Sequence, residues 1–167
     1  MSGSLRSLSP SEKIDWLRLS RAQGVGPITF FALLARYGSA AAALDMLPRL
    51  ASRAGRTAPS IPKADDLARE IERSEMLGFR MLAQCEAEYP RLLAEIEDAP
   101  PVIAAGRDPS LFARRTIAIV GARNASANGR RIAERLSHDL AEAGLVIVSG
   151  LARGIDTAAH HAALEGG

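Results

Sequence analysis

Apolar and polar positions recur at helical spacing through residues 1–78 and predict four helices there. Ser9-Pro10-Ser11-Glu12 has the pattern of a capping box with proline in the first turn, so a helix begins there and runs to about Ala22. Gly24-Val25-Gly26-Pro27 then breaks that helix, and Pro27 is suited to open the next. The remaining expected boundaries are Gly38 as the end of the second helix, Ser39 as the cap of a third that ends before Pro48, a loop over 52–62, and a fourth helix with Leu67, Ile71 and Leu77 that stops at Gly78.

After Gly78 the pattern changes to short apolar runs, which indicates strands. Residues 79–84 and 101–105 are two such runs, with a turn and a short helix between them. Residues 116–120 and 145–148 are short runs that are rich in β-branched residues and apolar apart from Thr116, which is typical of fully buried parallel strands. Between those two lies an amphipathic helix that ends at Gly144, so together they form a βαβ unit whose strand-end loops share one sheet edge. We expect an α/β protein with a helical domain in residues 1–78 and a second domain in 79–167.

The two loops that follow the parallel strands, residues 121–129 and 149–156, are the candidate site. Each combines glycines and an arginine with the start of a helix. Glycine lets main-chain N–H groups approach an anion, the helix start adds unpaired donors, and arginine matches phosphate oxygens. The sequence therefore predicts a phosphate-binding site, with these candidate residues: Gly121, Arg123, Ser126, Asn128, Ser149, Gly150, Arg153 and Gly154.

Other chemistries find less support in the residues. A dinucleotide site would need a glycine where Arg123 stands and an acidic residue at the end of the second strand, and a Walker loop is absent. Asp156 is a general base or, more in keeping with its position, a helix N-cap. His160 and His161 are adjacent on a helix and diverge, and His138 stands alone, so packing or surface roles are expected rather than metal binding.

Composition and charge narrow the setting. The 167 residues are 47% hydrophobic with a net charge of +2, which is typical of a globular protein, and no apolar run is long enough for a membrane helix. Residues 1–9 contain no apolar signal core, and Cys85 is alone, so we expect a cytoplasmic protein without disulfides, metal or cofactor. Residues 107–135 contain seven arginines and only two acidic residues, Asp108 and Glu134. Such a window suits an anionic partner, although a solvated helix face explains part of it equally well.

The motifs also resemble a known family. Residues 119–123 and 148–156, followed by His160, resemble the DNA-processing protein A family (DprA, also called Smf), as do residues 24–27, 89–93 and 100–106. Gly121 and Arg123 match its Gly-Ser/Thr-Arg phosphate loop, with Ala122 in place of the hydroxyl residue. Ser149, Gly150, Arg153 and Gly154 match its Ser-Gly-x-Ala-Arg-Gly segment.

The resemblance implies a helical domain like a sterile-alpha-motif (SAM) domain, followed by a Rossmann-like, mainly parallel sheet domain that is incomplete here, since the chain stops at Gly167 where the family continues. It implies a non-enzymatic protein that binds single-stranded DNA and needs no cofactor. It further implies protection of incoming DNA during natural transformation, loading of a RecA-type recombinase, and a homodimer in the full-length protein.

Two alternative functions remain open, and so does a second DNA site. A nucleoside-monophosphate hydrolase of the lysine-decarboxylase-like type would also bind phosphate on glycine loops, but this chain lacks that family's Pro-Gly-Gly-x-Gly-Thr pattern. A helical interaction module on an inert α/β scaffold is the second. The candidate second site is Gly24-Val25-Gly26 between two helices, which fits either a tight turn or a helix–hairpin–helix whose main-chain N–H groups contact a DNA phosphate.

Overall fold

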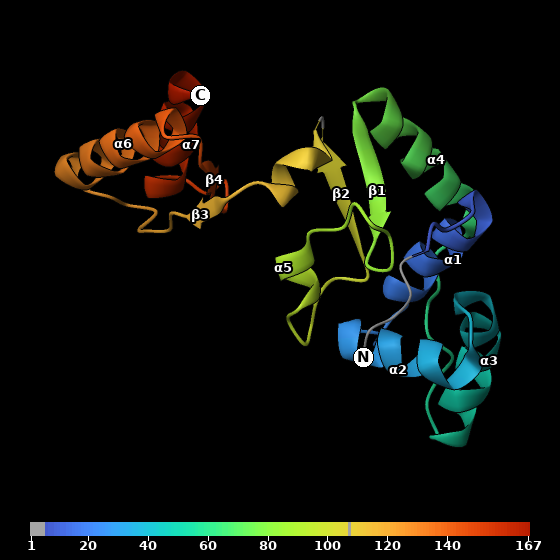
Figure 1. The fold of residues 1–167 in the computed structure, drawn as a ribbon. Coiled ribbons are helices and arrows are strands. Elements are labelled where there is room, and N and C mark those ends of the chain that lie inside the picture. Colours follow the sequence, from blue (N-terminus) through green and yellow to red (C-terminus); the bar gives the residue numbers. More distant parts are fainter. Residues whose placement is uncertain (1–5, 107) are drawn as a thin grey trace. The chain divides into compact units, whose positions relative to one another are not determined.

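Four helices form one end of the chain, and their boundaries follow the sequence pattern closely. In the computed structural model they are α1 (Pro10–Ser20), α2 (Pro27–Tyr37), α3 (Ala40–Arg53) and α4 (Ala64–Met76) (Figure 1). The structure describes residues 6–106 and 108–167, so Arg107 of the basic window and the first five residues of the expected signal-free start lie outside it. The capping box at α1 and the left-handed Gly38 after α2 are both confirmed.

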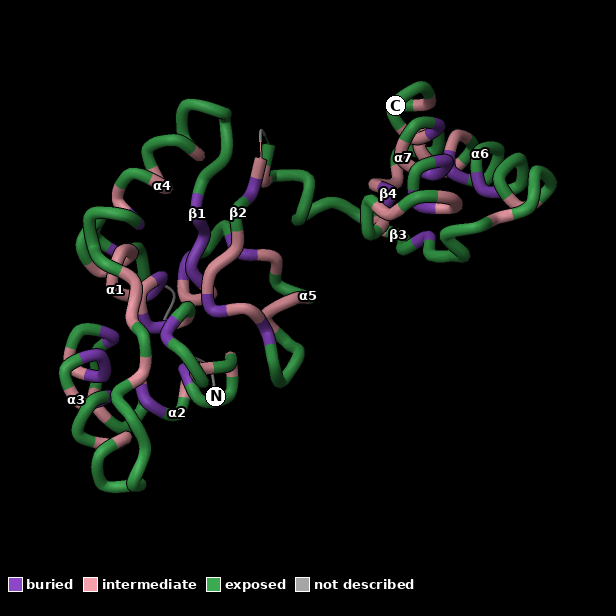
Figure 2. The backbone as a smooth tube through the Cα atoms, turned by 180° about the vertical axis from the view of Figure 1, so that it is seen from behind, coloured by how far each residue is buried: buried purple, intermediate pink, exposed green. Residues whose placement is uncertain are grey.

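A core of large apolar side chains joins α1, α2 and α3. The Trp16 ring lies edge-on to Phe30 with ring centroids 5.0 Å apart, and Phe30 is fully buried; the buried stretches are purple in Figure 2. Cys85 is half-buried against this core, and burial raises the pKa of its thiol, which agrees with its expected role as a small apolar group. In the described residues no single helix is long and apolar enough to cross a membrane; α2 and α3 meet that test only as a pair bent by 104°.

The expected end of the third helix before Pro48 is wrong. α3 continues through Pro48 to Arg53. Proline removes one backbone hydrogen bond from a helix, but the apolar face runs unbroken across it, because Leu44 and Leu47 on one side are buried and Leu50 on the other packs on the same core. Tertiary packing of that face outweighs the local preference for a break.

A pair of antiparallel strands packs on the helices. β1 (Phe79–Ala83) and β2 (Val102–Gly106) run from Phe79 opposite Gly106 to Ala83 opposite Val102, with the short helix α5 (Arg91–Ala94) between them in sequence. Met81 of β1 joins Leu17 of α1 and Leu67 of α4 in one apolar cluster. These elements form the first of two units, which ends at Pro109. The compact units divide after Pro109, thirty-one residues beyond the expected domain boundary at Gly78. A compact unit is not the same as a domain, so the boundary at Gly78 stays a prediction.

The second unit, from Ser110 to Gly167, contains the βαβ arrangement. After the 3-10 turn η1 (Pro109–Ala113), β3 (Thr116–Ala118) pairs in parallel with β4 (Val146–Val148) through α6 (Ala127–Glu142), and α7 (Ile155–Gly166) follows. The parallel pairing is confirmed. The expectation that both strands are fully buried is wrong, because α6 and α7 cover only the face with Ile119 and Ile147, whereas Val120 and Val148 on the other face are exposed.

Small side chains line the contact between α6 and α7. Ala133 and Ser137 of α6 are buried, as are Ala159 and Ala162 of α7. A Cβ atom added to Gly166 would lie 2.7 Å from the carbonyl oxygen of His138. The two helix backbones therefore approach closely, and the contact leaves little room for larger residues.

Replacing Ser137 by alanine is expected to stabilise the second unit by about 1 kcal/mol. The Ser137 hydroxyl is completely buried and is the buried side-chain polar atom without a hydrogen-bond partner among the described residues. Amide hydrogen exchange in α6 and α7 measures the change. Ser126→Ala serves as the control with the opposite sign, since the Ser126 hydroxyl caps α6. A loss of stability in Ser137→Ala would contradict the prediction.

Candidate functional site

The two predicted loops lie against each other at the carboxyl ends of β3 and β4. The carbonyl oxygen of Ala122 accepts a hydrogen bond from the N–H of Ile155 at 3.3 Å. A Cβ atom on Gly154 would lie 2.3 Å from that same oxygen, and one on Gly121 would lie 2.5 Å from the Ile155 side chain. The prediction that the loops share one edge of the parallel pair is thus confirmed, and the glycines permit the close contact. We call residues 119–126 the first loop and residues 149–154 the second loop.

The second loop is folded around the carboxylate of Asp156. Asp156 Oδ2 accepts hydrogen bonds from the N–H groups of Gly150 at 3.1 Å and Ala152 at 3.4 Å, and its residue is only 7% exposed. The prediction that Asp156 caps α7 is wrong, since Gly154 occupies the cap position with φ 89° and Asp156 is the second residue of the helix. Its carboxylate faces the loop amides and holds them in place, which also leaves it poorly placed to act as a general base.

Further hydrogen bonds tie the two loops together. The Ser149 hydroxyl donates to the carbonyl oxygen of Ile119 at 2.6 Å, which bridges the ends of the strands. The Thr157 hydroxyl donates to the carbonyl oxygen of Ala152 at 2.8 Å, and His160 Nε2 lies 3.3 Å from the carbonyl oxygen of Ser149. Side chains of α7 therefore hold the second loop in place at the carboxyl end of β4. We call the two loops at this edge of the sheet the platform.

Arg123 and Arg153 bring two positive charges to this platform. Both residues are exposed, and neither guanidinium makes an ion pair or hydrogen bond with any residue that the structure describes. Their backbones are close, because Gly154, directly after Arg153, lies against the carbonyl group of Arg123. Arg130 and Arg131 of α6 are also exposed and likewise unpaired within the described residues. The arginines are thus available to an anionic ligand in a way that ion-paired arginines are not.

The other predicted site residues divide by what their polar groups do. The Ser126 hydroxyl accepts from the N–H of Gly129 at 3.1 Å and so caps α6. The N–H of Gly150 faces Asp156, and the Ser149 hydroxyl faces Ile119. Asn128, in the first turn of α6, is exposed and makes no side-chain hydrogen bond within the described part of the chain. Among the predicted residues, Arg123, Arg153 and Asn128 present free side chains, and the ligand-binding role of all eight stays a prediction.

Sequence reasoning missed the conformation of Leu151. This residue has a φ of 54° and is 80% exposed at the tip of the second loop. Leucine disfavours the left-handed region, and no local signal in Ser-Gly-Leu-Ala-Arg-Gly marks the third residue as left-handed. The sequence also does not reveal that Asp156 accepts hydrogen bonds from loop amides, because an aspartate that caps a helix and one that binds a loop occupy similar sequence positions.

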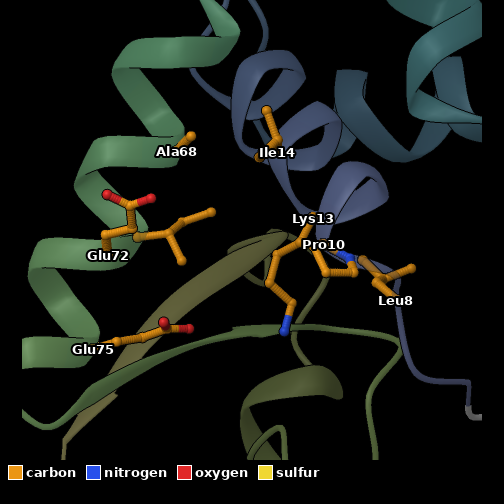
Figure 3. A pocket seen from close by; sticks show the side chains of 8 residues that line it. Leu8, Pro10, Lys13, Ile14, Ala68, Glu72 and Glu75 are labelled. Atoms are coloured by element: carbon orange, nitrogen blue, oxygen red, sulfur yellow. The ribbon is translucent and has the colours of Figure 1, made fainter.

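Two grooves lie elsewhere, on the first unit. A groove of about 340 Å³ separates α1 from α4, with Lys13 on one side and Glu72 and Glu75 on the other (Figure 3). Lys13 Nζ is paired with Glu86 at 3.1 Å. A second groove of about 600 Å³ borders Gly24 and Val25. The chain turns between α1 and α2, with Gly24 at φ 80°, as both readings of Gly24-Val25-Gly26 require, and contact of this turn with DNA stays a prediction.

A set of possible metal ligands lies on the surface of α6. His138 Nδ1 is 3.7 Å from carboxylate oxygens of Asp139 and Glu142, and the ligand atoms of the three lie within 4.8 Å of one another. The two acidic residues are exposed, so the group has the character of a solvated helix face, and the packing or surface role expected of His138 stays a prediction.

Known proteins resemble this chain over both units. The chain is 42% identical over 103 residues to the DNA processing protein DprA of Streptococcus pneumoniae, covering 62% of this chain and 35% of that protein. It is 29% identical over 175 residues to protein Smf of Synechocystis, and the match covers 95% of this chain and 42% of that protein. The chain thus spans less than half the length of these relatives. The X-ray structure of DprA from Streptococcus pneumoniae matches with a TM-score of 0.66 at 23% identity over 96% of this chain and 56% of that one, which supports the fold.

Two family models match successive parts of the chain. The model described as a DprA-like N-terminal HHH domain matches residues 10–72, which contain α1, α2, α3 and most of α4. The model described as DNA recombination-mediator protein A matches residues 80–167, which contain both loops. The expected fold class, a helical N-terminal region followed by an α/β region with a parallel sheet, is confirmed. Since the second model alone covers more than half of the sequence, the chain belongs to the DNA recombination-mediator protein A (DprA) family.

Proposed function

We propose that this chain binds single-stranded DNA through the two adjoining loops, as a DNA-binding part of a DprA-type protein. One observation carries the proposal: Arg123 and Arg153, both exposed and unpaired within the described residues, project from loops whose backbones touch. Phosphates of a DNA backbone are a matching ligand for such a pair of guanidinium groups. The names of the relatives, which are DNA processing proteins, favour DNA over other phosphate compounds.

The wider role follows from the family. We infer that the full-length protein, acting in the cytoplasm as a homodimer, protects incoming single-stranded DNA in natural transformation and passes it to a RecA-type recombinase. Binding and delivery need no bond to be made or broken, so a non-enzymatic role fits. The hydrolase alternative is disfavoured because Asp156, the acidic residue nearest the phosphate loops in sequence, is held by the amides of Gly150 and Ala152.

Salt dependence of DNA binding tests the proposal. Binding of the chain to oligothymidine is expected to weaken with salt, with a log–log slope of about −0.7 for each phosphate contacted. Arg123→Ala and Arg153→Ala are each expected to lower affinity about tenfold and to reduce the slope by about one phosphate contact, because each removes one charge-assisted contact. Fluorescence anisotropy of a labelled oligonucleotide at two or more salt concentrations gives both quantities.

Arg73→Ala is the matched control. Arg73 in α4 is also exposed and unpaired within the described residues, so its replacement changes the net charge equally without touching the loops. It is expected to leave the affinity and slope nearly unchanged. Equal losses in all three variants would show a general charge effect, and unchanged binding in the two loop variants would refute the proposed site. Release of free base from a nucleotide would instead support the hydrolase.

A further inference from the structure

The tip of the second loop carries an unusual apolar residue. Leu151 is the non-glycine residue with a positive φ among the described residues, at 54°, and it is 80% exposed. Leucine has no intrinsic reason to adopt the left-handed region, and exposed apolar surface gains nothing from water. Leu151 thus combines an unfavourable backbone conformation with an exposed apolar side chain. This combination suggests a contact that the isolated chain does not contain.

Asp156 accounts for how Leu151 is held. Its Oδ2 atom accepts from the N–H groups of Gly150 and Ala152, the residues on either side of Leu151. With both neighbouring amides turned inward to one carboxylate, the backbone between them is bent, and the leucine side chain is left in solvent. The Thr157 hydroxyl fixes the same segment through the carbonyl oxygen of Ala152. Leu151 is therefore presented by a rigid loop, which lowers the entropy that a contact would cost.

The surroundings of Leu151 match one kind of ligand. Arg153 is two residues away, and Arg123 belongs to the loop that touches Gly154. Val120, 78% exposed, belongs to the first loop and lies two residues beyond Ala118, where the registered pairs of the sheet end. Apolar side chains next to unpaired cations fit a ligand with an anionic backbone and flat apolar faces. Single-stranded nucleic acid offers both, whereas the base faces of a duplex are stacked against each other.

We propose that Leu151 packs against an unstacked base of the bound strand while Arg123 and Arg153 bind the neighbouring phosphates. The inference rests on the proposed function, and it adds a base contact to a site so far described by phosphates alone. Apolar side chains such as leucine are known to pack against base faces in other DNA-binding proteins. The contact is insensitive to sequence, because every base presents a similar face.

The test compares two probes of equal length and charge, oligothymidine and an oligonucleotide made wholly of abasic sites. The wild-type chain is expected to prefer oligothymidine by roughly five- to tenfold, the size of one base contact. Leu151→Gly, which suits the left-handed backbone, is expected to remove most of this preference, leaving affinity for the abasic probe and the salt slope unchanged. Arg123→Ala is expected to weaken binding to both probes.

Leu164→Ala provides the matched control, since Leu164 is 82% exposed on α7 and helical. It is expected to keep the full preference for oligothymidine. If the wild type binds neither probe, the proposed function itself fails. If it binds both equally, or if Leu151→Gly retains the preference, the base contact is refuted while phosphate binding stands. If Leu151→Gly weakens binding to both probes, the leucine shapes the loop rather than contacting a base, which also overturns the inference.

Discussion

Replacing Gly154 by alanine is expected to destabilise the second unit by about 4 kcal/mol or more. Gly154 has φ 89° and ψ −121°, a backbone conformation that L-residues rarely adopt. A Cβ atom there would also lie 2.3 Å from the carbonyl oxygen of Ala122 and 2.6 Å from that of Arg123. Both obstacles are backbone atoms, so they cannot move aside as a flexible side chain could, and the two loops must separate to admit the methyl group.

Gly144→Ala separates the two causes. Gly144, after α6, has a similar φ of 81°, but a Cβ atom there meets nothing within 4 Å. Its replacement is expected to cost only about 1 kcal/mol, the price of the left-handed backbone. Amide hydrogen exchange in α6 and α7 measures both variants. The fluorescence of Trp16, the only tryptophan and a core residue of the first unit, serves as an internal reference. Equal losses in the two variants would show that the loops do not need their close contact.

The loop contact was predictable because it depends on topology. Two apolar β-branched runs joined by an amphipathic helix predict parallel strands, and parallel strands place their following loops at one edge. No fine geometry is needed for that step. Pro48 shows the opposite case: the rule that proline ends a helix is local, and the apolar face of α3 that overrides it becomes visible only when Leu47 and Leu50 are seen packed on the same core.

Burial and hydrogen-bond partners were harder to predict than topology. The run Thr116–Val120 looks fully buried because a sequence cannot show which faces of a strand are covered, and here one face is open. The chemistry of Ser149 and Gly150 predicts ligand donors, yet their polar groups face Ile119 and Asp156 within the protein. A polar group in a glycine loop can bind either a ligand or another group of the protein. Only the structure shows that the polar groups of Ser149 and Gly150 bind within the protein.

Replacing Asp156 by alanine is expected to destabilise the second unit by about 3 kcal/mol. The substitution removes a charged acceptor from two main-chain N–H groups in a partly buried site and leaves those donors without a partner. Thr157→Val is the matched control, because it removes one neutral hydrogen bond from the same loop at an exposed residue, and it is expected to cost about 1 kcal/mol or less. Hydrogen exchange in α7 gives both values.

Pairing this change with substitutions at Leu151 tests whether Asp156 imposes the left-handed backbone. With Asp156 present, Leu151→Gly is expected to be more stable than Leu151→Ala by about 1 kcal/mol, because glycine tolerates a φ of 54° and alanine does not. In the Asp156→Ala background the loop is free to relax, so the order is expected to reverse, since glycine then has the greater entropy to lose on folding. The same order in both backgrounds would mean that the loop keeps its shape without the carboxylate. Reversal would show that one buried side chain sets the conformation of the residue we place against the DNA base.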